Sequence, residues 1–228
     1  MNFVRLNITV EGQTEENFVK HVLSNHLSEF NISAAPRAVM TSRDKRTNYT
    51  NRGGLSKYDK VKKDIKSWIR EDNNPECRFT TMFDLYALPK DFPGYDSAIK
   101  ERDPYDKVRI LEDKFKEDIA DERFIPYIQL HEFETLIFAC PKMLDIEYFD
   151  HESQIENLEK MLAENNGNPE LINDNATTAP SKRILKEIPE YDKATIGPIV
   201  VENIGLPTLQ NKCRHFNEWI IALEKLSE

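Results

Sequence analysis

Carboxylate side chains follow three of the segments that are expected to form core strands. They are Glu11 and Glu15 after residues 3–10, Asp84 at the end of residues 78–85, and Glu132 and Glu134 after residues 124–130. Ligands of open parallel sheets bind outside the carboxyl ends of the strands, so we expect these side chains to converge. Crowded carboxylates repel one another unless a cation lies between them, and hard oxygen ligands suit Mg²⁺ or Mn²⁺. The spacing predicts an acidic metal site anchored by Glu11.

Each acid taken singly also has a structural explanation. Glu11 and Glu15 could simply favour the positive end of a helix, and Asp84 could form an Asx turn. Glu132 and Glu134 lie on different sides of a helix, so only one would face the site, unless the strand continues through residue 134. The coincidence of all these acids at one edge of the predicted sheet favours a metal site.

Alternating strand and helix patterns are expected to position these acids. Strands are predicted over residues 3–10, 32–40, 78–85 and 124–130, where β-branched and aromatic residues are frequent. Apolar residues at helical spacing predict helices over residues 15–30, 56–73, 104–119 and 132–140, and the polar stretch 41–54 is predicted to be a loop. This order predicts an α/β fold with a mainly four-stranded parallel sheet flanked by helices.

The strand signal vanishes after Pro141, and only helical patterns remain, over residues 153–165, 180–187 and 213–226. We therefore predict an α/β domain over residues 1–140 and a helical C-terminal extension over residues 141–228 that packs on it.

Composition excludes several classes of protein. The chain has 228 residues, of which 39% are hydrophobic and 31% charged, which is typical of a globular protein with a charged surface. It contains no apolar run of about 18 residues, and its first residues lack the pattern of a signal peptide, so we expect a cytoplasmic protein with no membrane partner. Cys77, Cys140 and Cys213 lie far apart, which argues against a zinc site and a disulfide framework.

The net charge of −9 argues against nucleic-acid binding by bulk electrostatics, but the charge is uneven. Residues 43–63 hold eight basic residues against two acidic ones. Such a segment could bind a polyanion, with a solvated loop as the alternative. The candidate nucleic-acid contacts in it are Arg43, Lys45, Arg46 and Arg52.

Three segments carry a resemblance to known proteins: Val10–Glu15, Phe83–Pro89 and His131–Phe138. Together they resemble the Toprim fold of topoisomerases, bacterial primases and the overcoming-lysogenisation-defect nucleases. They are more closely similar to a Toprim-like bacterial family of unknown function, whose members are often encoded beside an ATPase in phage-defence loci. Pro180–Arg183 and Tyr191–Lys193 also look like that family.

This resemblance implies a Toprim-like, Rossmann-like sheet and a metal-dependent nuclease that uses Mg²⁺ or Mn²⁺. Its substrate would be DNA or RNA, with DNA favoured over RNA. It implies that Glu11 is a ligand or an acid–base group and that Asp84 is a ligand, with Glu15 and one of Glu132 or Glu134 completing the set. The sequence departs from the Toprim pattern at Tyr86, where a second aspartate is usual.

Basic residues and one histidine could assist the chemistry. His131 or Lys182 could transfer protons or contact the phosphate, and Arg183 and Lys193 could bind phosphates from the tail. The alternatives are a structural histidine and a short helix whose basic side chains are merely solvated.

A second functional interpretation is a non-catalytic Toprim-like subunit that docks on the ATPase, which the tyrosine at position 86 and the negative charge favour. Glu11, Glu15 and the basic segment favour the nuclease. A topoisomerase or primase module is disfavoured, because no strand-passage domain or nucleophilic-tyrosine module is evident.

Overall fold

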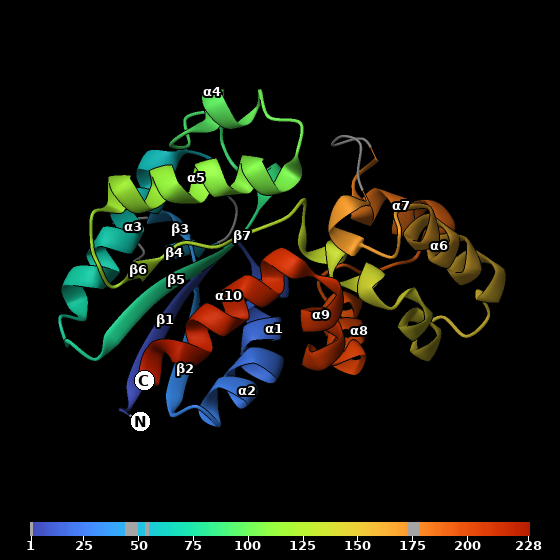
Figure 1. The fold of residues 1–228 in the computed structure, drawn as a ribbon, viewed down its shortest axis with the longest axis horizontal. Helices are drawn as coiled ribbons and strands as arrows, with labels where there is room; N and C mark the ends of the chain where they lie inside the picture. Colours follow the sequence, from blue (N-terminus) through green and yellow to red (C-terminus); the bar gives the residue numbers. More distant parts are fainter. Residues whose placement is uncertain (1, 44–49, 53–54, 173–177) are drawn as a thin grey trace.

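The protein is built on a parallel sheet in the order β2-β1-β5-β6, in which β7 also pairs with β5. The computed structural model describes residues 2–43, 50–52, 55–172 and 178–228 (Figure 1). The strands of this sheet are β1 (Val4–Val10), β2 (Ile32–Ala38), β5 (Cys77–Asp84), β6 (Phe124–Ile125) and β7 (Ile128–Gln129). The predicted α/β fold, with a parallel sheet between helices and a helical C-terminal region, is confirmed.

β1 lies in the interior of the sheet, because it pairs with β2 on one side and with β5 on the other. Leu6, Ile8 and Val10 are fully buried in one hydrophobic core. Both faces of this part of the strand are covered, and the intervening Asn7 and Thr9 are buried and uncharged. Pro36 lies in β2 at the edge of the sheet, where its missing backbone N–H is tolerated.

Helices cover both faces of the sheet (Figure 1). One face carries α3 (Tyr58–Glu71) and α5 (Pro104–Ile119), with the short α4 (Tyr95–Ala98) beside α5. The other face carries α1 (Gln13–Phe18), α2 (Ser24–Ser28) and α10 (Arg214–Glu224). α5 begins at Pro104, as predicted. Asp103 caps the helix by accepting a hydrogen bond from the Tyr105 backbone N–H, and Pro104 has no backbone N–H that would need a hydrogen-bond acceptor there.

Some local predictions are corrected by the structure. Residues 13–28 are helical throughout, which confirms the helix predicted over residues 15–30, although a π-helical turn, η1 (Val19–Leu23), lies in its middle. The predicted loop at 41–54 instead contains the antiparallel pair β3 (Met40–Arg43) and β4 (Thr50–Arg52). The predicted fourth strand is divided into β6 and β7. Residues 132–140, predicted as a helix, form the 3₁₀ turns η3 (Phe133–Thr135) and η4 (Ile137–Ala139). Cys140 has non-helical backbone, as the following Pro141 favours.

The C-terminal helices α6 to α9 gather beyond the carboxyl ends of the strands (Figure 1). They are α6 (Glu152–Glu164), α7 (Pro180–Glu187), α8 (Ile196–Ile204) and α9 (Leu206–Lys212). The remaining 3₁₀ turns are η2 (Leu85–Ala87), η5 (Pro141–Ile146), η6 (Pro169–Leu171) and η8 (Lys225–Ser227). Within the described part of the chain, no helix is long and apolar enough to cross a bilayer.

α10 returns from this group of helices to the sheet. Trp219 donates a hydrogen bond from Nε1 to Thr80 Oγ1 at 3.0 Å and stacks on Tyr127, with ring centroids 4.1 Å apart. The buried Glu170 caps α10 by accepting hydrogen bonds from the backbone N–H groups of His215 and Phe216. The C-terminal helices therefore share a hydrophobic core with the sheet, and the division at residue 140 stays a prediction.

Candidate functional site

The predicted acids of the first and third strands lie beside each other at the carboxyl edge of the sheet. Glu11 directly follows β1, and Asp84 is the last residue of β5, which pairs with β1 so that Val10 lies opposite Met82. Glu15 lies in α1, one helical turn after Glu11. The chain passes from β1 to β2 on one side of β1 and then crosses to β5 on the other side. In doubly wound sheets, ligands bind at the carboxyl edge where the direction of the connections changes in this way, and the acids lie at that point.

The acids after the last strand complete this group. β7 places Gln129 opposite Asp84, and the chain then turns at His131, which has a φ of 63°. Glu132 has extended backbone and Glu134 lies in η3. Both carboxylates are buried and both approach the same lysine, so both face the site. We call this group the acidic cluster: Glu11, Glu15, Asp84, Glu132 and Glu134.

Lys193 lies inside the acidic cluster. Its Nζ is 2.9 Å from Glu134 Oε2, 3.6 Å from Asp84 Oδ2 and 3.9 Å from Glu132 Oε2. Although burial opposes the charge, the neighbouring carboxylates of Asp84, Glu134 and Glu132 raise the pKa of Lys193 above its usual value. The sequence interpretation gave Lys193 to phosphate binding, and the structure instead shows an ion pair with the acids.

Three buried oxygens of the acidic cluster, Glu11 Oε2, Asp84 Oδ1 and Glu134 Oε2, have no hydrogen bond within the described residues. Of these, Glu134 Oε2 forms an ion pair with Lys193, whereas Glu11 Oε2 and Asp84 Oδ1 have no ion pair there either. Buried polar atoms are normally satisfied, and a buried carboxylate oxygen without a donor is costly. An oxygen of this kind matches the preference of Mg²⁺ and Mn²⁺ for hard ligands, so the donor chemistry of the acidic cluster fits such a cation.

The environment raises the pKa values of four of the acids, Glu11, Glu15, Asp84 and Glu134. Desolvation by burial, followed by the charge of Glu15, raises the pKa of Glu11 to about 7. Burial raises the pKa of Glu134 to about 7, and burial followed by the charge of Glu15 raises the pKa of Asp84 well above its usual value. Burial also raises the pKa of Glu15. Perturbations of this size collect at functional sites more often than elsewhere.

Backbone and tail groups hold the acids in place. The Gly12 backbone N–H donates to Glu15 Oε2 at 2.9 Å, and the Ser181 backbone N–H, at the start of α7, donates to Glu132 Oε1. Tyr191 donates from its hydroxyl to Glu134 Oε1 at 3.3 Å. A Cβ atom at Gly197 would lie 2.8 Å from that hydroxyl, which explains the glycine. The C-terminal helices therefore supply part of the site.

The acids do not yet form a coordination sphere. Across the described residues, no three His, Cys, Asp or Glu side chains are close enough together to hold one ion. The carboxylates of Asp84, Glu132 and Glu134 instead surround the Lys193 ammonium. Binding of a divalent cation therefore requires these side chains to move closer together.

The histidine and the basic residues of the tail have other environments. His131 is buried, its Nε2 lies 2.8 Å from the Glu170 carbonyl oxygen, and burial lowers its pKa to about 4. It is therefore neutral at pH 7 and is unsuited to donate a proton there. Lys182 is exposed on α7, and Arg183 donates to the Thr178 carbonyl oxygen at 2.8 Å. The functional roles predicted for these three residues stay predictions.

The predicted nucleic-acid contacts fall largely outside what the structure describes. Lys45 and Arg46 lie outside the described residues, and Arg43 and Arg52 lie in β3 and β4, where only the backbone is described. The exposed side chains of Lys57, Lys60 and Lys63 extend the basic segment along α3.

Tyr86 lies next to the site, at the position where the sequence resemblance led us to expect a second aspartate. It follows Asp84 in η2, and its side chain is 37% exposed. Its ring centroid lies 5.6 Å from that of His131. Tyr86 therefore presents an aromatic surface rather than a metal ligand.

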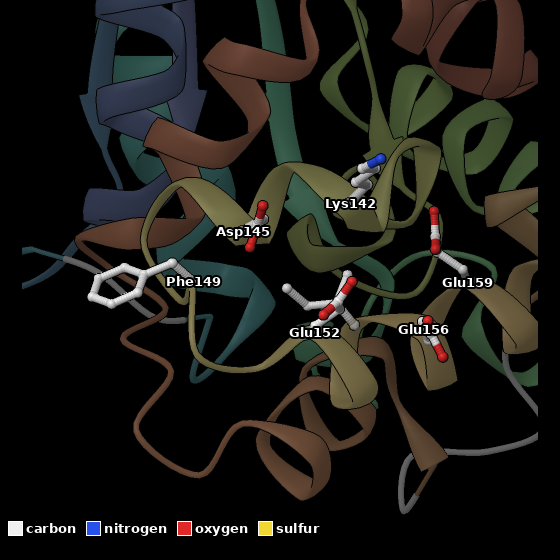
Figure 2. A pocket seen from close by; sticks show the side chains of 7 residues that line it. Lys142, Asp145, Phe149, Glu152, Glu156 and Glu159 are labelled. Atoms are coloured by element: carbon white, nitrogen blue, oxygen red, sulfur yellow. The ribbon is translucent and has the colours of Figure 1, made fainter.

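A pocket of about 380 Å³ lies elsewhere, between η5 and α6 (Figure 2). Asp145, Glu156 and Lys142 are among its lining residues, and all three are exposed. The exposed ring of Phe149 points away from the other labelled side chains (Figure 2). No residue of the acidic cluster lines this pocket, and solvated charges on a helix are an ordinary surface feature, so we assign it no chemistry.

The raised pKa of Glu11 predicts a pH-dependent effect of Glu11→Gln on stability. The pKa of Glu11 is about 7 in the folded protein, against 4.5 for an ordinary glutamate. Between pH 4.5 and pH 7 the folded protein therefore binds a proton at Glu11 that the unfolded protein has lost. The free energy of unfolding of the wild type therefore falls as pH rises through this range. Glutamine cannot titrate, so the variant lacks this pH dependence. On going from pH 4.5 to pH 8, the free energy of unfolding of the variant should therefore rise by about 2–3 kcal/mol relative to that of the wild type.

Urea unfolding at pH 4.5 and pH 8 with a chelator measures this difference. The exposed Glu202→Gln provides a matched control. An equal effect of Glu11→Gln at both pH values would contradict the prediction.

Sequence reasoning overlooked three groups that the structure places at the acids: the Lys193 ammonium as an ion-pair partner, the Tyr191 hydroxyl and the Ser181 backbone N–H. Their only sequence signal was the family resemblance of the two short tail segments that contain them.

Among known proteins, the chain is similar to one family, and that family has no assigned function. Residues 10–224 match the family described as Domain of unknown function (DUF4276). No curated protein and no solved structure matches the chain significantly.

Proposed function

Because the chain belongs to the family described as Domain of unknown function (DUF4276), its activity has to be argued from the acidic cluster, and we propose that it is a metal-dependent nuclease. The observation that carries this proposal is the pair of buried, unpartnered oxygens, Glu11 Oε2 and Asp84 Oδ1, at adjacent strand ends. Each such oxygen costs free energy unless a partner satisfies it, and a bound cation would be such a partner.

The cation of this proposal is Mg²⁺ or Mn²⁺. Asp84 and Glu11 hold it, with Glu132 or Glu134 from the third strand end and Glu15 behind them. When bound, a cation of this kind neutralises a phosphodiester, lowers the pKa of an attacking water and stabilises the leaving oxygen.

The residues of the chain supply the remaining functions. Without metal, Glu11 has a pKa of about 7 and releases its proton near neutral pH, which leaves it free to act as an anionic ligand. Glu15 is held in place beside Glu11 by the hydrogen bond that its Oε2 accepts from the Gly12 backbone N–H. Gly12, Ser181 and Tyr191 orient the carboxylates from behind, as supporting hydrogen bonds do in metal sites.

The substrate of this proposal is a nucleic acid, with DNA as the first to test and RNA as the second. The basic segment at residues 43–63, which includes the exposed Lys60 and Lys63 of α3, would run along its phosphates. Tyr86, exposed beside Asp84, offers a ring on which a base can stack.

The cellular setting of the proposal is cytoplasmic phage defence, with an ATPase partner encoded nearby. Its support is the resemblance of the strand-end and tail segments to Toprim-like families. A nuclease in the cytoplasm has to be restrained in an uninfected cell, and a partner ATPase would provide that control. A freely active isolated protein would contradict this part of the proposal.

A second candidate function is a non-catalytic subunit of that ATPase. Two observations favour it: Tyr86 stands where a second aspartate is expected, and the Lys193 ammonium already neutralises part of the acidic cluster. In this alternative the acids and Lys193 form a structural ion-pair network, and a cation adds nothing.

A cleavage assay separates the two functions. Purified protein, with and without the neighbouring ATPase, is incubated with DNA and RNA in Mg²⁺, Mn²⁺ or chelator, beside Glu11→Ala. The nuclease proposal expects cleavage that requires a cation and is lost in the variant. Cleavage that survives Glu11→Ala would remove Glu11 from the mechanism, and no cleavage under any of these conditions would support the subunit.

A further inference from the structure

The segment between α7 and α8 places the ammonium group of Lys193 among the carboxylates of the acidic cluster. Among the described residues, Lys193 forms the ion pairs that join Asp84, Glu132 and Glu134. We propose that Lys193 is the resident cation of the acidic cluster and that a divalent cation binds there by displacing its ammonium group. This inference rests on the proposed function only in taking the acidic cluster as the metal site. It adds to that function how the site is occupied when no divalent cation is bound.

The distances explain why the two cations exclude each other. The Lys193 Nζ atom lies between 2.9 and 3.9 Å from one oxygen of each of three carboxylates. A divalent cation needs oxygens of the same side chains, at shorter distances. Two positive charges would then lie within a few ångströms of each other in a largely buried site, where their repulsion is weakly screened.

The unpartnered oxygens show that Lys193 neutralises the acidic cluster incompletely. Asp84 is 5% exposed, and its Oδ1 has no hydrogen bond within the described residues although its Oδ2 faces the ammonium. Glu11 Oε2 is likewise without a partner there. One ammonium group offers three donors, too few for the oxygens of five acids. The site therefore retains affinity for a cation of higher charge.

The surroundings of Lys193 allow the exchange without unfolding. Its side chain is 42% exposed, so the ammonium has a path to solvent along its flexible stem. The backbone on either side is held: Tyr191 is buried against Glu134, and Asp192 Oδ1 accepts hydrogen bonds from the backbone N–H groups of Ala194 and Thr195. A change of side-chain rotamer is therefore sufficient to open the site.

A consequence for binding follows directly. Removing the ammonium should leave the carboxylates to the divalent cation alone, so Lys193→Met should bind Mn²⁺ more tightly than the wild type. A lysine that instead only contacted the substrate would leave Mn²⁺ affinity unchanged when it was replaced.

Calorimetric titration of the full-length chain with Mn²⁺ alone tests this. We expect at least about tenfold tighter binding for Lys193→Met, a difference of about 1.4 kcal/mol. Lys193→Arg, which keeps the charge, should bind Mn²⁺ as weakly as the wild type. Lys186→Met, which removes an exposed lysine on α7, is the matched control. Equal or weaker Mn²⁺ binding by Lys193→Met would overturn the proposal.

A second measurement uses the wild type and so does not depend on the folding of a variant. Each lysine is labelled with an amine-reactive reagent and quantified by mass spectrometry, with and without Mn²⁺. Labelling of Lys193 should rise several-fold on addition of Mn²⁺, while labelling of Lys186 stays constant. Unchanged or reduced labelling of Lys193 would contradict displacement.

These outcomes are distinct from failure of the nuclease proposal. Tighter Mn²⁺ binding by Lys193→Met without any cleavage by the wild type would retain the exchange and reject the nuclease. Metal-dependent cleavage by the wild type, with Mn²⁺ affinity unaffected by Lys193→Met, would retain the nuclease and reject the exchange.

Discussion

Asp84→Asn should lower the rate of metal-dependent cleavage by at least about 100-fold relative to the wild type, without lowering the thermal stability of the protein. Asp84 is 5% exposed and holds one of the two unpartnered oxygens of the acidic cluster. An amide has one oxygen and no charge, so it is a much weaker ligand of a hard cation. The pKa of Asp84 is raised well above its usual value by burial and by Glu15, so its charged form is unfavourable in the metal-free protein.

The melting temperature without metal should therefore stay equal or rise slightly in Asp84→Asn. Asp113→Asn, the same chemical change at an exposed position of α5, is the control for both measurements. Initial cleavage rates over a range of Mn²⁺ concentrations and thermal unfolding with a chelator give the two values. A variant that kept more than a tenth of the wild-type rate would rule out Asp84 as a metal ligand.

Trp219→Ala should lower the free energy of unfolding by about 3–5 kcal/mol, the usual cost of removing a large buried aromatic side chain. Trp219 is 4% exposed and stacks on Tyr127 at 4.1 Å, with the two rings nearly parallel. Its removal leaves a cavity between α10 and the sheet and takes away the indole N–H that donates to Thr80 Oγ1.

Urea unfolding followed by far-ultraviolet circular dichroism measures this loss. Because α10 shares its core with β1 and β5, we expect a single transition in which the sheet and the C-terminal helices unfold together. Ile221→Ala, on the same helix but 38% exposed, should cost less than about 1 kcal/mol. A separate early transition of the helices would instead support an α/β domain over residues 1–140 that folds independently.

The position of the acids could be predicted because it follows from local patterns. Strand residues are recognisable by their alternation and β-branching, and a strand that alternates with helices is parallel to its neighbours. Residues directly after such strands must then meet at one edge. Glu11 and Asp84 are therefore adjacent in the structure, as expected. Two helix starts were predictable from a local signal: α5 begins at Pro104 and α7 begins at Pro180, as predicted.

Other features depend on neighbours that are distant in the chain. Residues 50–52 are polar, and they form a strand only because β3 provides its hydrogen-bonding partner. The apolar residues of α10 predicted a helix, but not that its tryptophan packs on β5 rather than on the other C-terminal helices. Packing choices of this kind depend on the shape of the assembled core.

For the site, the sequence by itself determined which carboxylates gather and at which edge of the sheet, because β-strand geometry and the order of elements fix both. Only the tertiary structure decided that Glu132 and Glu134 both face inward and that Lys193 lies between them and Asp84. That lysine comes from the segment between α7 and α8, more than a hundred residues after Asp84. No local pattern specifies such a contact, since it exists only once the C-terminal helices have packed against the carboxyl edge of the sheet.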